Sequence, residues 1–422
     1  MADLYGTESF TNVATTLDEE FCNGTDSINA STEAVATSLQ YRSIFIAYIS
    51  IILPLILVIG VIDNALFLLV VRKIDTMKNV TNAYLSSLAI ADILFLVFVI
   101  GHKLWKFIAS PQVTIDDSCL GSLGCVIFFV SSSVTYLASL CFITLVAWER
   151  RQAVRYPHLV GKNRFHNRKK CFKMITFSWL ISFLLAGSFI PSFAILKEIC
   201  IIWPEGEQFL QYPRVVHICS SVSKSYENFT HILQTLPFFL AMAMNMYLYV
   251  DILQGLKESA ERVQSFDSLA KATSRKKEES RTINQTIKML VINGLSFFAL
   301  LAPFEILNVC TLFNGLAGNT LISTNSFTYR TVVWIARTLS YINTLINPVV
   351  YVSFSSKYRQ AFKETVHDIY YRIVPCQRDT HGQQGGRPVS STPIVNTSAG
   401  TNDWNDNTRS SAEVLETQDT KL

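Results

Sequence analysis

Polar residues inside long apolar segments are the first residues of this sequence that could do chemistry. Asp92 lies in the apolar segment 82–108. A charge within a membrane is costly, so such a residue indicates a function by default. Ser139, Asn343 and Asn347 lie in later apolar segments and could join Asp92 around one buried pocket. A carboxylate with neutral oxygens suits a small hard cation such as sodium, and a hydrogen-bond network between helices without an ion is the alternative.

Long helices are needed to hold these side chains in place, and the sequence supplies seven long apolar segments. Half of the 422 residues are hydrophobic and only 16% are charged, which is too apolar for an ordinary soluble protein of this size. About 20 apolar residues in a helix cross a bilayer core of roughly 30 Å. We therefore predict an all-α membrane protein, a seven-transmembrane helix bundle. The predicted spans are residues 44–71, 82–108, 122–148, 171–196, 229–255, 284–312 and 330–354.

Prolines interrupt several of these predicted spans. A proline inside a helix removes a backbone hydrogen bond and tends to kink the helix. Kinked helices leave cavities and can pivot, so the pattern favours a switching protein over a passive anchor. The prolines are Pro54, Pro191, Pro237, Pro303 and Pro348.

The distribution of charge predicts which side of the membrane each end of the chain faces. Residues 1–40 contain acidic residues but no Lys or Arg, whereas the loops after the third and fifth spans are strongly basic. Because basic loops mark the cytoplasmic side, we expect an outer N-terminus, a cytoplasmic C-terminus and an odd number of crossings. Basic loops placed between apolar spans argue against a nucleic-acid partner. The expected location is the plasma membrane.

Four regions follow from this topology. Residues 1–42 form a polar outer tail, residues 43–355 the bundle, residues 356–372 a short amphipathic helix on the membrane surface, and residues 373–422 a cytoplasmic tail. The amphipathic helix is predicted because apolar residues recur every four positions there, which gives one apolar face. These residues are Phe354, Tyr358, Phe362 and Val366.

Several positions outside the spans match modification signals. Asn23, Asn29 and Asn228 each begin an Asn-x-Ser/Thr glycosylation motif on the predicted outer side. Cys376 lies just beyond the amphipathic helix and is a candidate for palmitoylation, with an unmodified thiol as the alternative. The C-terminal tail is rich in Ser and Thr, which fits either a solvated disordered tail or phosphorylation sites that bind a basic partner surface.

Taken together and in order along the chain, short motifs on the predicted helices resemble the rhodopsin-like (class A) G-protein-coupled receptors. The resemblance runs from about residue 44 to residue 366. It rests on Asp63-Asn64 in the first helix, Leu88-Ala89-Ile90-Ala91-Asp92 in the second, Cys125 and Glu149-Arg150-Arg151 at the two ends of the third, Trp179 in the fourth, Pro237 in the fifth, Pro303 in the sixth and Asn347-Pro348-Val349-Val350-Tyr351 in the seventh.

This resemblance implies roles for individual residues. Arg150 would hold the resting state beside Glu149 and contact a heterotrimeric G protein on activation, with Arg155 lining the opened cytoplasmic cavity. The seventh-helix motif and Pro303 would take part in switching, and the polar set around Asp92 would form an allosteric sodium pocket. Such a receptor is not an enzyme and needs no further cofactor or metal. Arrestin and receptor kinases would bind the Ser/Thr-rich tail.

The resemblance also implies a disulfide from Cys125 to the loop before the fifth helix. Cys219 is the expected partner and Cys200 is the alternative. An oxidising outer compartment makes the bridge plausible. Cys22, Cys119 and Cys200 leave room for an additional outer bridge that the sequence does not assign.

The chain departs from the family pattern at positions involved in switching. Arg151 replaces the family's Tyr after the triplet Arg, and Leu301 replaces the sixth-helix Trp. Phe297, one turn below, is expected to take over the packing role of that Trp. We therefore expect this receptor to switch with a different set of packing residues.

The kind of ligand follows partly by exclusion and partly from resemblance. Ser132 occupies the position where aminergic receptors carry an Asp, and Tyr341 the position of the retinal-binding Lys of opsins. The chain looks similar to thyrotropin-releasing-hormone receptors and to invertebrate receptors for FMRFamide-like peptides, in which an Arg at the position of Arg337 contacts the amidated end of the peptide. We therefore predict a neuropeptide ligand. The expected ligand-binding residues are Arg337, Glu305, Ser132, His102, Lys103, Phe304 and Tyr341.

Alternatives to this interpretation stay open. Arg337 and Glu305 could pair with each other instead of holding the ligand. A receptor for a lipid or chemosensory ligand on the same fold would need neither charge. A seven-helix transporter would need a chain of titratable groups across the membrane, and the sequence shows only Asp92 and the outer charged cluster.

Overall fold

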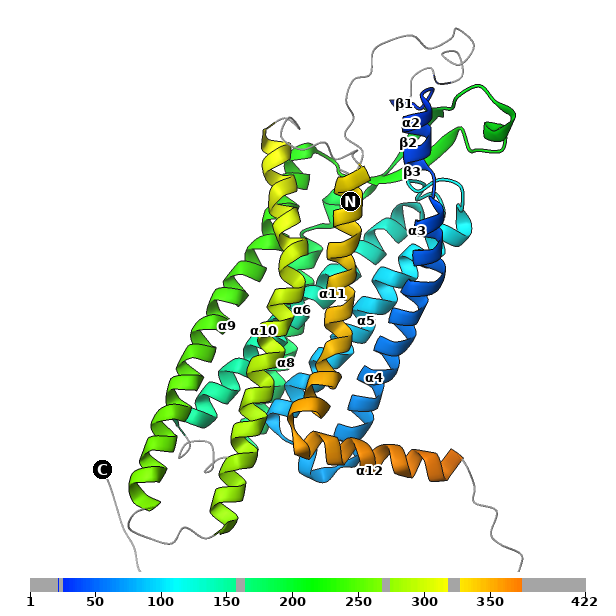
Figure 1. Cartoon of the computed structure of the whole chain (residues 1–422). Coiled ribbons are helices and arrows are strands. Elements are labelled where there is room, and N and C mark those ends of the chain that lie inside the picture. Colours follow the sequence, from blue (N-terminus) through cyan, green and yellow to red (C-terminus); the bar gives the residue numbers. More distant parts are fainter. Residues whose placement is uncertain (1–21, 23–25, 157–163, 268–273, 318–326, 374–422) are drawn as a thin grey trace, which may run out of the picture. The chain divides into compact units, whose positions relative to one another are not determined.

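The computed structural model describes residues 22, 26–156, 164–267, 274–317 and 327–373. Its long helices run side by side (Figure 1). The first span combines α3 (Ser43–Ala47), a π-helical turn η2 (Tyr48–Ile52) and α4 (Leu53–Lys73). The other long helices are α5 (Val80–Ala109), α6 (Gly121–Arg155), α8 (Arg164–Gly187), α9 (Lys224–Asp267), α10 (Ser274–Leu316) and α11 (Phe327–Phe354).

The predicted seven-helix bundle is confirmed. Six stretches among the described residues are long and apolar enough to cross a membrane: Ser43–Lys73, Val80–Ala109, Gly121–Arg155, Arg168–Gly187, Lys224–Glu258 and Ile287–Leu316. The seventh helix, α11, is more polar because it carries Arg330, Arg337, Asn343 and Asn347. It nevertheless packs against α10, α4 and α5 as part of the same bundle.

Aromatic side chains fill the centre of the bundle. Phe67, Phe142, Phe238, Phe297 and Tyr351 are all essentially buried. Large aliphatic and aromatic side chains on the outward faces of the helices are instead exposed, as a surface in contact with lipid requires. The helices therefore bury aromatic rings inward and present apolar side chains outward.

The structure places one of the prolines differently from the sequence prediction. α8 ends at Gly187, and Pro191 lies beyond it in the short 3₁₀ turn η4 (Ile190–Ser192), so the predicted fourth span was too long. Pro191 has no N–H to bond to the carbonyl of Gly187 four residues earlier, and its ring would clash with that carbonyl in a continued helix, which is consistent with this early end. Pro54 lies inside the first span as predicted, directly after the π-helical turn η2 and near the start of α4. Pro237, Pro303 and Pro348 do lie inside helices.

A small sheet at one end of the bundle adds to the predicted all-helical fold. Strand β2 (Ile195–Ile202) pairs antiparallel with β3 (Val215–Ser220) and parallel with β1 (Asp26–Asn29). Strand β1 and the following helix α2 (Glu33–Leu39) come from the segment predicted to be a flexible tail. They pack on a separate apolar cluster that includes Ala36, Leu39, Val113, Ile201 and Val216. This apolar cluster explains why part of the tail is ordered.

Two disulfides hold this end together. Cys125 at the start of α6 bonds to Cys219 of β3, which confirms the expected pairing and excludes the Cys200 alternative. Cys200 of β2 instead bonds to Cys22, which assigns the additional outer bridge. Cys119 is a free thiol, and burial together with the carboxylates of Asp116 and Asp117 raises its pKa.

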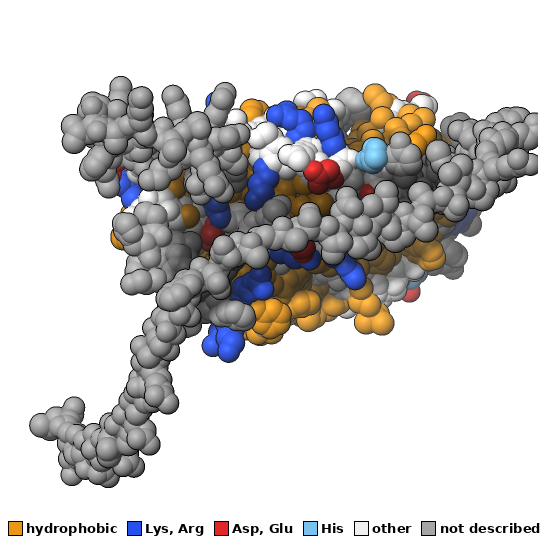
Figure 2. Space-filling view, turned by 90° about the horizontal axis from the view of Figure 1, so that it is seen from below, with side chains coloured by type: hydrophobic (Ala, Val, Ile, Leu, Met, Phe, Trp, Pro, Cys, Tyr) orange, Lys and Arg blue, Asp and Glu red, His pale blue; other side chains and the backbone are white. Residues whose placement is uncertain are grey.

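The amphipathic helix is present as α12 (Ser356–Ile373), at the opposite end of the bundle from the sheet (Figure 1). Tyr358 is buried and its hydroxyl donates to Asn82 of α5, whereas Phe354 and Val366 are exposed. One part of the predicted apolar face of α12 therefore packs against the bundle, and another part is exposed. Lys and Arg side chains gather on this end of the molecule (Figure 2).

Removing the two disulfides should have different effects. Cys125→Ser unpins α6 from β3 and removes a stabilisation of about 2–4 kcal/mol, so we expect a lower temperature of thermal unfolding. Cys22→Ser frees only the N-terminal segment, so hydrogen exchange should rise across residues 26–40 while the helices stay protected. Cys119→Ser is the matched control, with neither effect. Equal unfolding temperatures for wild type and Cys125→Ser would contradict this assignment.

Candidate ligand cavity and buried polar groups

A cavity of about 140 Å³ lies at the sheet end of the bundle. Its walls come from residues 37–49, the end of α5, the α5–α6 connection, α6, strand β3 and the first turns of α11. Its lining includes Tyr41, Lys103, Ile218, Trp334 and Arg337. The N-terminal segment therefore forms part of the site, although the sequence prediction gave that segment no role in binding.

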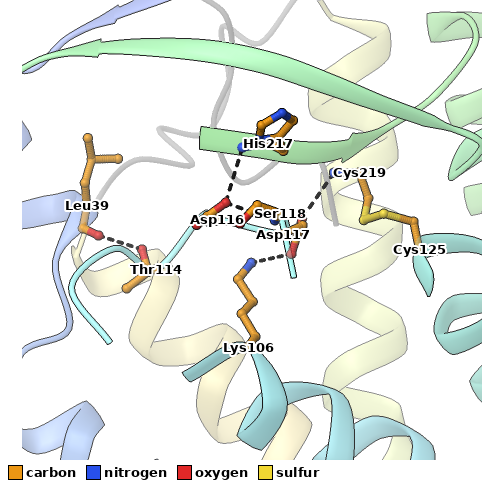
Figure 3. A network of polar contacts seen from close by, with 9 residues as sticks. All are labelled: Leu39, Lys106, Thr114, Asp116, Asp117, Ser118, Cys125, His217 and Cys219. Atoms are coloured by element: carbon orange, nitrogen blue, oxygen red, sulfur yellow. Dashed lines mark hydrogen bonds and ion pairs between the residues drawn. A yellow bond between two sulfur atoms is a disulfide. The ribbon is translucent and has the colours of Figure 1, made fainter. Parts of the chain in front are cut away.

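A network of polar contacts fixes the wall between α5 and β3 (Figure 3). Lys106 Nζ lies 2.6 Å from Asp117 Oδ1, and the other carboxylate oxygen of Asp117 accepts the backbone N–H of Cys219 at 3.1 Å. Asp116 accepts the backbone N–H groups of Ser118 and His217 at 2.9 and 3.3 Å. Lys106 is thus paired with Asp117. The two aspartates fix the backbone of β3 at His217 and Cys219, next to the disulfide.

The N-terminal segment is fixed over the cavity by backbone and side-chain contacts. The carbonyl of Leu39 accepts the N–H of Thr114 at 2.8 Å and its hydroxyl at 3.0 Å. Arg330 of α11 donates to the carbonyl of Ser38. The segment therefore joins the α5–α6 connection to α11 across the cavity.

Three of the predicted ligand-binding residues meet in this cavity: Arg337, Lys103 and His102. Lys103 Nζ lies 5.5 Å from the centre of the Trp334 ring, and His102 stacks on Phe128 with ring centres 5.4 Å apart. The prediction that α5 and α11 supply cations to one site is consistent with this geometry.

Glu305 lies elsewhere. It is completely buried in α10 and does not line the cavity. The hydroxyl of Tyr136 in α6 donates to its carboxylate at 2.5 Å, and Asn308 donates at 3.3 Å. Arg337 instead has its guanidinium carbon 5.8 Å from the ring centre of Phe304. The mutual Arg337–Glu305 pair does not form, and Glu305 ties α10 to α6.

Ser132, Phe304 and Tyr341 also lie outside the cavity lining. The Ser132 hydroxyl donates to the carbonyl of Phe129 on its own helix at 2.8 Å. Tyr341 is buried, with its ring centre 6.3 Å from that of Phe95. Phe304 does not line the cavity, but its ring lies beside the guanidinium of Arg337, which does.

The polar residues predicted to surround Asp92 are brought together. Asn347 Nδ2 donates to Asp92 at 2.7 Å, and the Ser139 hydroxyl lies 3.4 Å from the other carboxylate oxygen. Asn343 is buried, and the side-chain oxygens of Asn343 and Asn347 have no hydrogen-bond partner among the described residues. One carboxylate with several neutral oxygens is a suitable donor set for a sodium ion.

At the α12 end, the Glu149-Arg150-Arg151 triplet makes two separate sets of ion pairs. Arg150 pairs with its neighbour Glu149 at 2.5 Å, and Glu149 also accepts from Thr81 of α5 at 2.7 Å. Arg151, which replaces the family's Tyr, lies 2.5 Å from Asp251 of α9. The substitution therefore adds a link between α6 and α9.

Arg155, predicted to line a cytoplasmic cavity, joins this same link. It pairs with Asp251 at 2.7 Å and with Glu258 at 2.9 Å. Asp251 therefore neutralises two guanidinium groups from successive turns of α6.

The region around the missing Trp is filled by phenylalanines. Leu301 is buried, and Phe297 packs edge to face against Phe298 with ring centres 5.3 Å apart. Phe298 in turn contacts Phe238 of α9 at 5.7 Å. Pro303 lies in α10, the helix that carries Phe297 and Phe298. Pro348 lies in α11 together with Tyr351, whose ring centre is 5.1 Å from that of Phe67.

Some functional residues were missed by the sequence prediction. Arg330, Trp334 and Arg337 follow one another at helical spacing, so they share a face of α11. That spacing could have identified Arg330 and Trp334. Nothing in the sequence indicated that Tyr41 and its neighbours would close over the cavity, because this depends on the pairing of β1 with β2.

The predicted modification sites are only partly described. Asn23 and Cys376 lie outside the described residues. Asn29 is in β1 and accepts the N–H of Ser31, and Asn228 is in α9 two residues before the buried Thr230. Glycosylation at these positions remains a prediction.

The bundle, the cavity at one end and the buried polar groups define a multi-pass membrane protein with the architecture of a receptor. A family model described as "7 transmembrane receptor (rhodopsin family)" matches residues 63–351. The chain belongs to this family, which confirms the resemblance seen in the sequence.

Curated relatives of the chain include three receptors named for peptides. The neuromedin-U receptor 2 of Mus musculus is 24% identical over 323 residues, 75% of each chain. The allatostatin-A receptor of Bombyx mori is 25% identical over 319 residues, covering 74% of this chain and 77% of the relative. The thyrotropin-releasing hormone receptor of Bos taurus is 25% identical over 353 residues, covering 78% and 79%.

The hydrogen bond between Tyr136 and Glu305 can be tested by stability. Tyr136→Phe leaves a buried carboxylate without its short hydrogen bond, at a cost of about 1–3 kcal/mol. We expect the purified protein in detergent to unfold about 2–5 °C lower than wild type. Tyr247→Phe on the exposed side of α9 is the matched control, with no change. Equal unfolding temperatures for both variants would show that the contact contributes nothing.

Proposed function

We propose that this chain is a G-protein-coupled receptor for a peptide, in which binding at the sheet end promotes nucleotide exchange on a heterotrimeric G protein at the α12 end. The observation that carries the proposal is the cavity that joins the N-terminal segment, β3, α5 and α11. Membership in the rhodopsin family and the peptide receptors among its relatives support the same function.

The orientation follows from the charges. Lys and Arg side chains gather at the α12 end (Figure 2), as expected for the cytoplasmic side. We therefore infer an outer N-terminus and a cytoplasmic C-terminus in the plasma membrane, with arrestin and receptor kinases as further partners of the Ser/Thr-rich tail.

The resting and active states would differ at the contacts between α6 and its neighbours. Arg150 is engaged with Glu149 in the described conformation. An agonist must bind the active state more tightly than the resting one to shift the population. The guanidinium would then leave Glu149 and bind the inserted end of the G protein, while α10 moves away from α6 and breaks the bond between Tyr136 and Glu305.

Arg150→Ala should abolish G-protein activation, because the group that contacts the G protein is gone. The measurement is nucleotide exchange on purified G protein added to the receptor in lipid nanodiscs, together with surface expression in cells. Lys363→Ala, which changes an exposed residue of α12, serves as the control for loss of one positive charge at this end. Normal exchange by Arg150→Ala would rule out the proposed mechanism.

Arg337→Ala should weaken the potency of a peptide agonist by at least about tenfold, which corresponds to about 1.4 kcal/mol. The agonist would first be found by calcium and cyclic-nucleotide assays of transfected cells against a neuropeptide library. An unchanged dose–response curve, at normal surface expression, would remove Arg337 from the binding site. A response to lipids alone would favour the receptor for a small non-peptide ligand.

A sodium ion in the Asp92 pocket would act as an allosteric cofactor. The ion would be held by Asp92, Ser139, Asn343 and Asn347. Its positive charge would balance the negative charge of the Asp92 carboxylate. Asp92→Asn should therefore abolish the effect of sodium on agonist affinity while choline chloride at equal ionic strength has no effect on either protein. Retention of a sodium effect in Asp92→Asn would favour the ion-free hydrogen-bond network.

A further inference from the structure

The cavity carries more positive charge than its own carboxylates can neutralise. Its lining includes the cations of Arg42, Lys103, Lys106, Arg330 and Arg337 but the carboxylate of Asp117 alone. Asp117 is already paired with Lys106 at 2.6 Å. Among the described residues, no carboxylate lies within ion-pair distance of Lys103, Arg330 or Arg337.

These three cations are held close together. Arg330 and Arg337 share a face of α11 with Trp334 between them, and Lys103 lies over that Trp334 ring at 5.5 Å. Lys103 and Arg337 are near enough to repel each other. An aromatic ring stabilises a cation only weakly, so the Trp334 ring does not remove this repulsion.

Hydrogen-bonding groups in the same cavity are also left unmatched. The Nε atoms of Arg330 and Arg337 are buried and have no hydrogen-bond partner within the described part of the chain. His102 is only 8% exposed, and its Nε2 is likewise without a partner. Buried donors without acceptors are costly, and a planar guanidinium is best satisfied by two oxygens of one anion.

We infer that this cavity binds a carboxylate of the ligand, held by Lys103, Arg330 and Arg337 with His102 as a further hydrogen-bond partner. The inference rests on the proposed peptide-receptor function and narrows it to peptides with an acidic group. A neutral amidated end would leave three cations facing one another without a counter-charge. The carboxylate belongs either to the free C-terminus of the peptide or to an Asp or Glu side chain, since both present the same chemistry.

The cavity size agrees with recognition of one end of a peptide. Its volume of about 140 Å³ is below the roughly 300–1,000 Å³ usual for drug-sized ligands. The rest of the peptide would lie outside this cavity, along the N-terminal segment and β3.

A first experiment needs neither the agonist nor signalling. Thermal unfolding of the purified full-length receptor is measured with glutarate, a dicarboxylate, and with glutaramide, its neutral diamide, at ionic strength matched by sodium chloride. Glutarate at several times its dissociation constant should raise the unfolding temperature by about 1–2 °C, and glutaramide should not. The rise should vanish in Lys103→Gln/Arg337→Gln and persist in Lys224→Gln, which removes an exposed charge at the same end of the bundle. Equal shifts with both compounds, or a shift that survives in the double variant, would overturn the inference.

A second experiment identifies the source of the carboxylate. Each active peptide is synthesised as the free acid, as the C-terminal amide, and with every Asp and Glu replaced by Asn and Gln. Either amidation of the C-terminus or replacement of the acidic side chains should raise the half-maximal concentration on the wild-type receptor at least about tenfold. That difference between peptides should shrink in Lys103→Gln/Arg337→Gln.

The outcomes separate this inference from the proposed function. A receptor that signals equally well to neutral amidated peptides would keep the peptide function and lose the carboxylate site. A chain that responds to no peptide but still shows the glutarate shift would keep the carboxylate site and lose the peptide function.

Discussion

A polar group in the interior of a membrane protein has no bulk water to bind, so it must find its partner on a neighbouring helix. This constraint organises the bundle. Asp92 is satisfied by Asn347 of α11 and Ser139 of α6, and Glu305 by Tyr136 of α6. These polar contacts therefore join α5 to α6 and α11, and α6 to α10, while the aromatic side chains fill the space between the helices.

The same constraint explains how this receptor can lack the sixth-helix Trp of its family. Leu301 provides apolar packing but no polar contact, and Phe297 and Phe298 fill the remaining volume. The short hydrogen bond between Tyr136 and Glu305 supplies a specific link between α6 and α10 near that level. A bond of this kind is either made or broken, which makes it suited to a two-state switch.

Much of the bundle and part of the site could be predicted from the sequence. Hydropathy located the helices, and the polar residues within them indicated the Asp92 group, because burial in a membrane leaves few alternatives. Arg337 was predicted as a ligand-binding residue from the resemblance to peptide receptors. The partner of Glu305 was missed since a carboxylate in an apolar helix can turn toward the ligand or toward a neighbouring helix, and only the position of Tyr136 decides. The ordered N-terminal segment was missed because strand pairing with β2 and the Cys22–Cys200 bridge join residues far apart in sequence.

The N-terminal segment over the cavity is attached at both ends, by Cys22–Cys200 and β1 on one side and by the start of the first span on the other. A molecule that reaches Arg337 must therefore pass beside a fixed strand and cannot displace a free tail. Passage in and out is slowed equally by such an obstruction, so it lengthens the lifetime of a complex without changing its affinity. The second disulfide would thus set the duration of a signal, while the charges in the cavity set the concentration of ligand at which the signal begins.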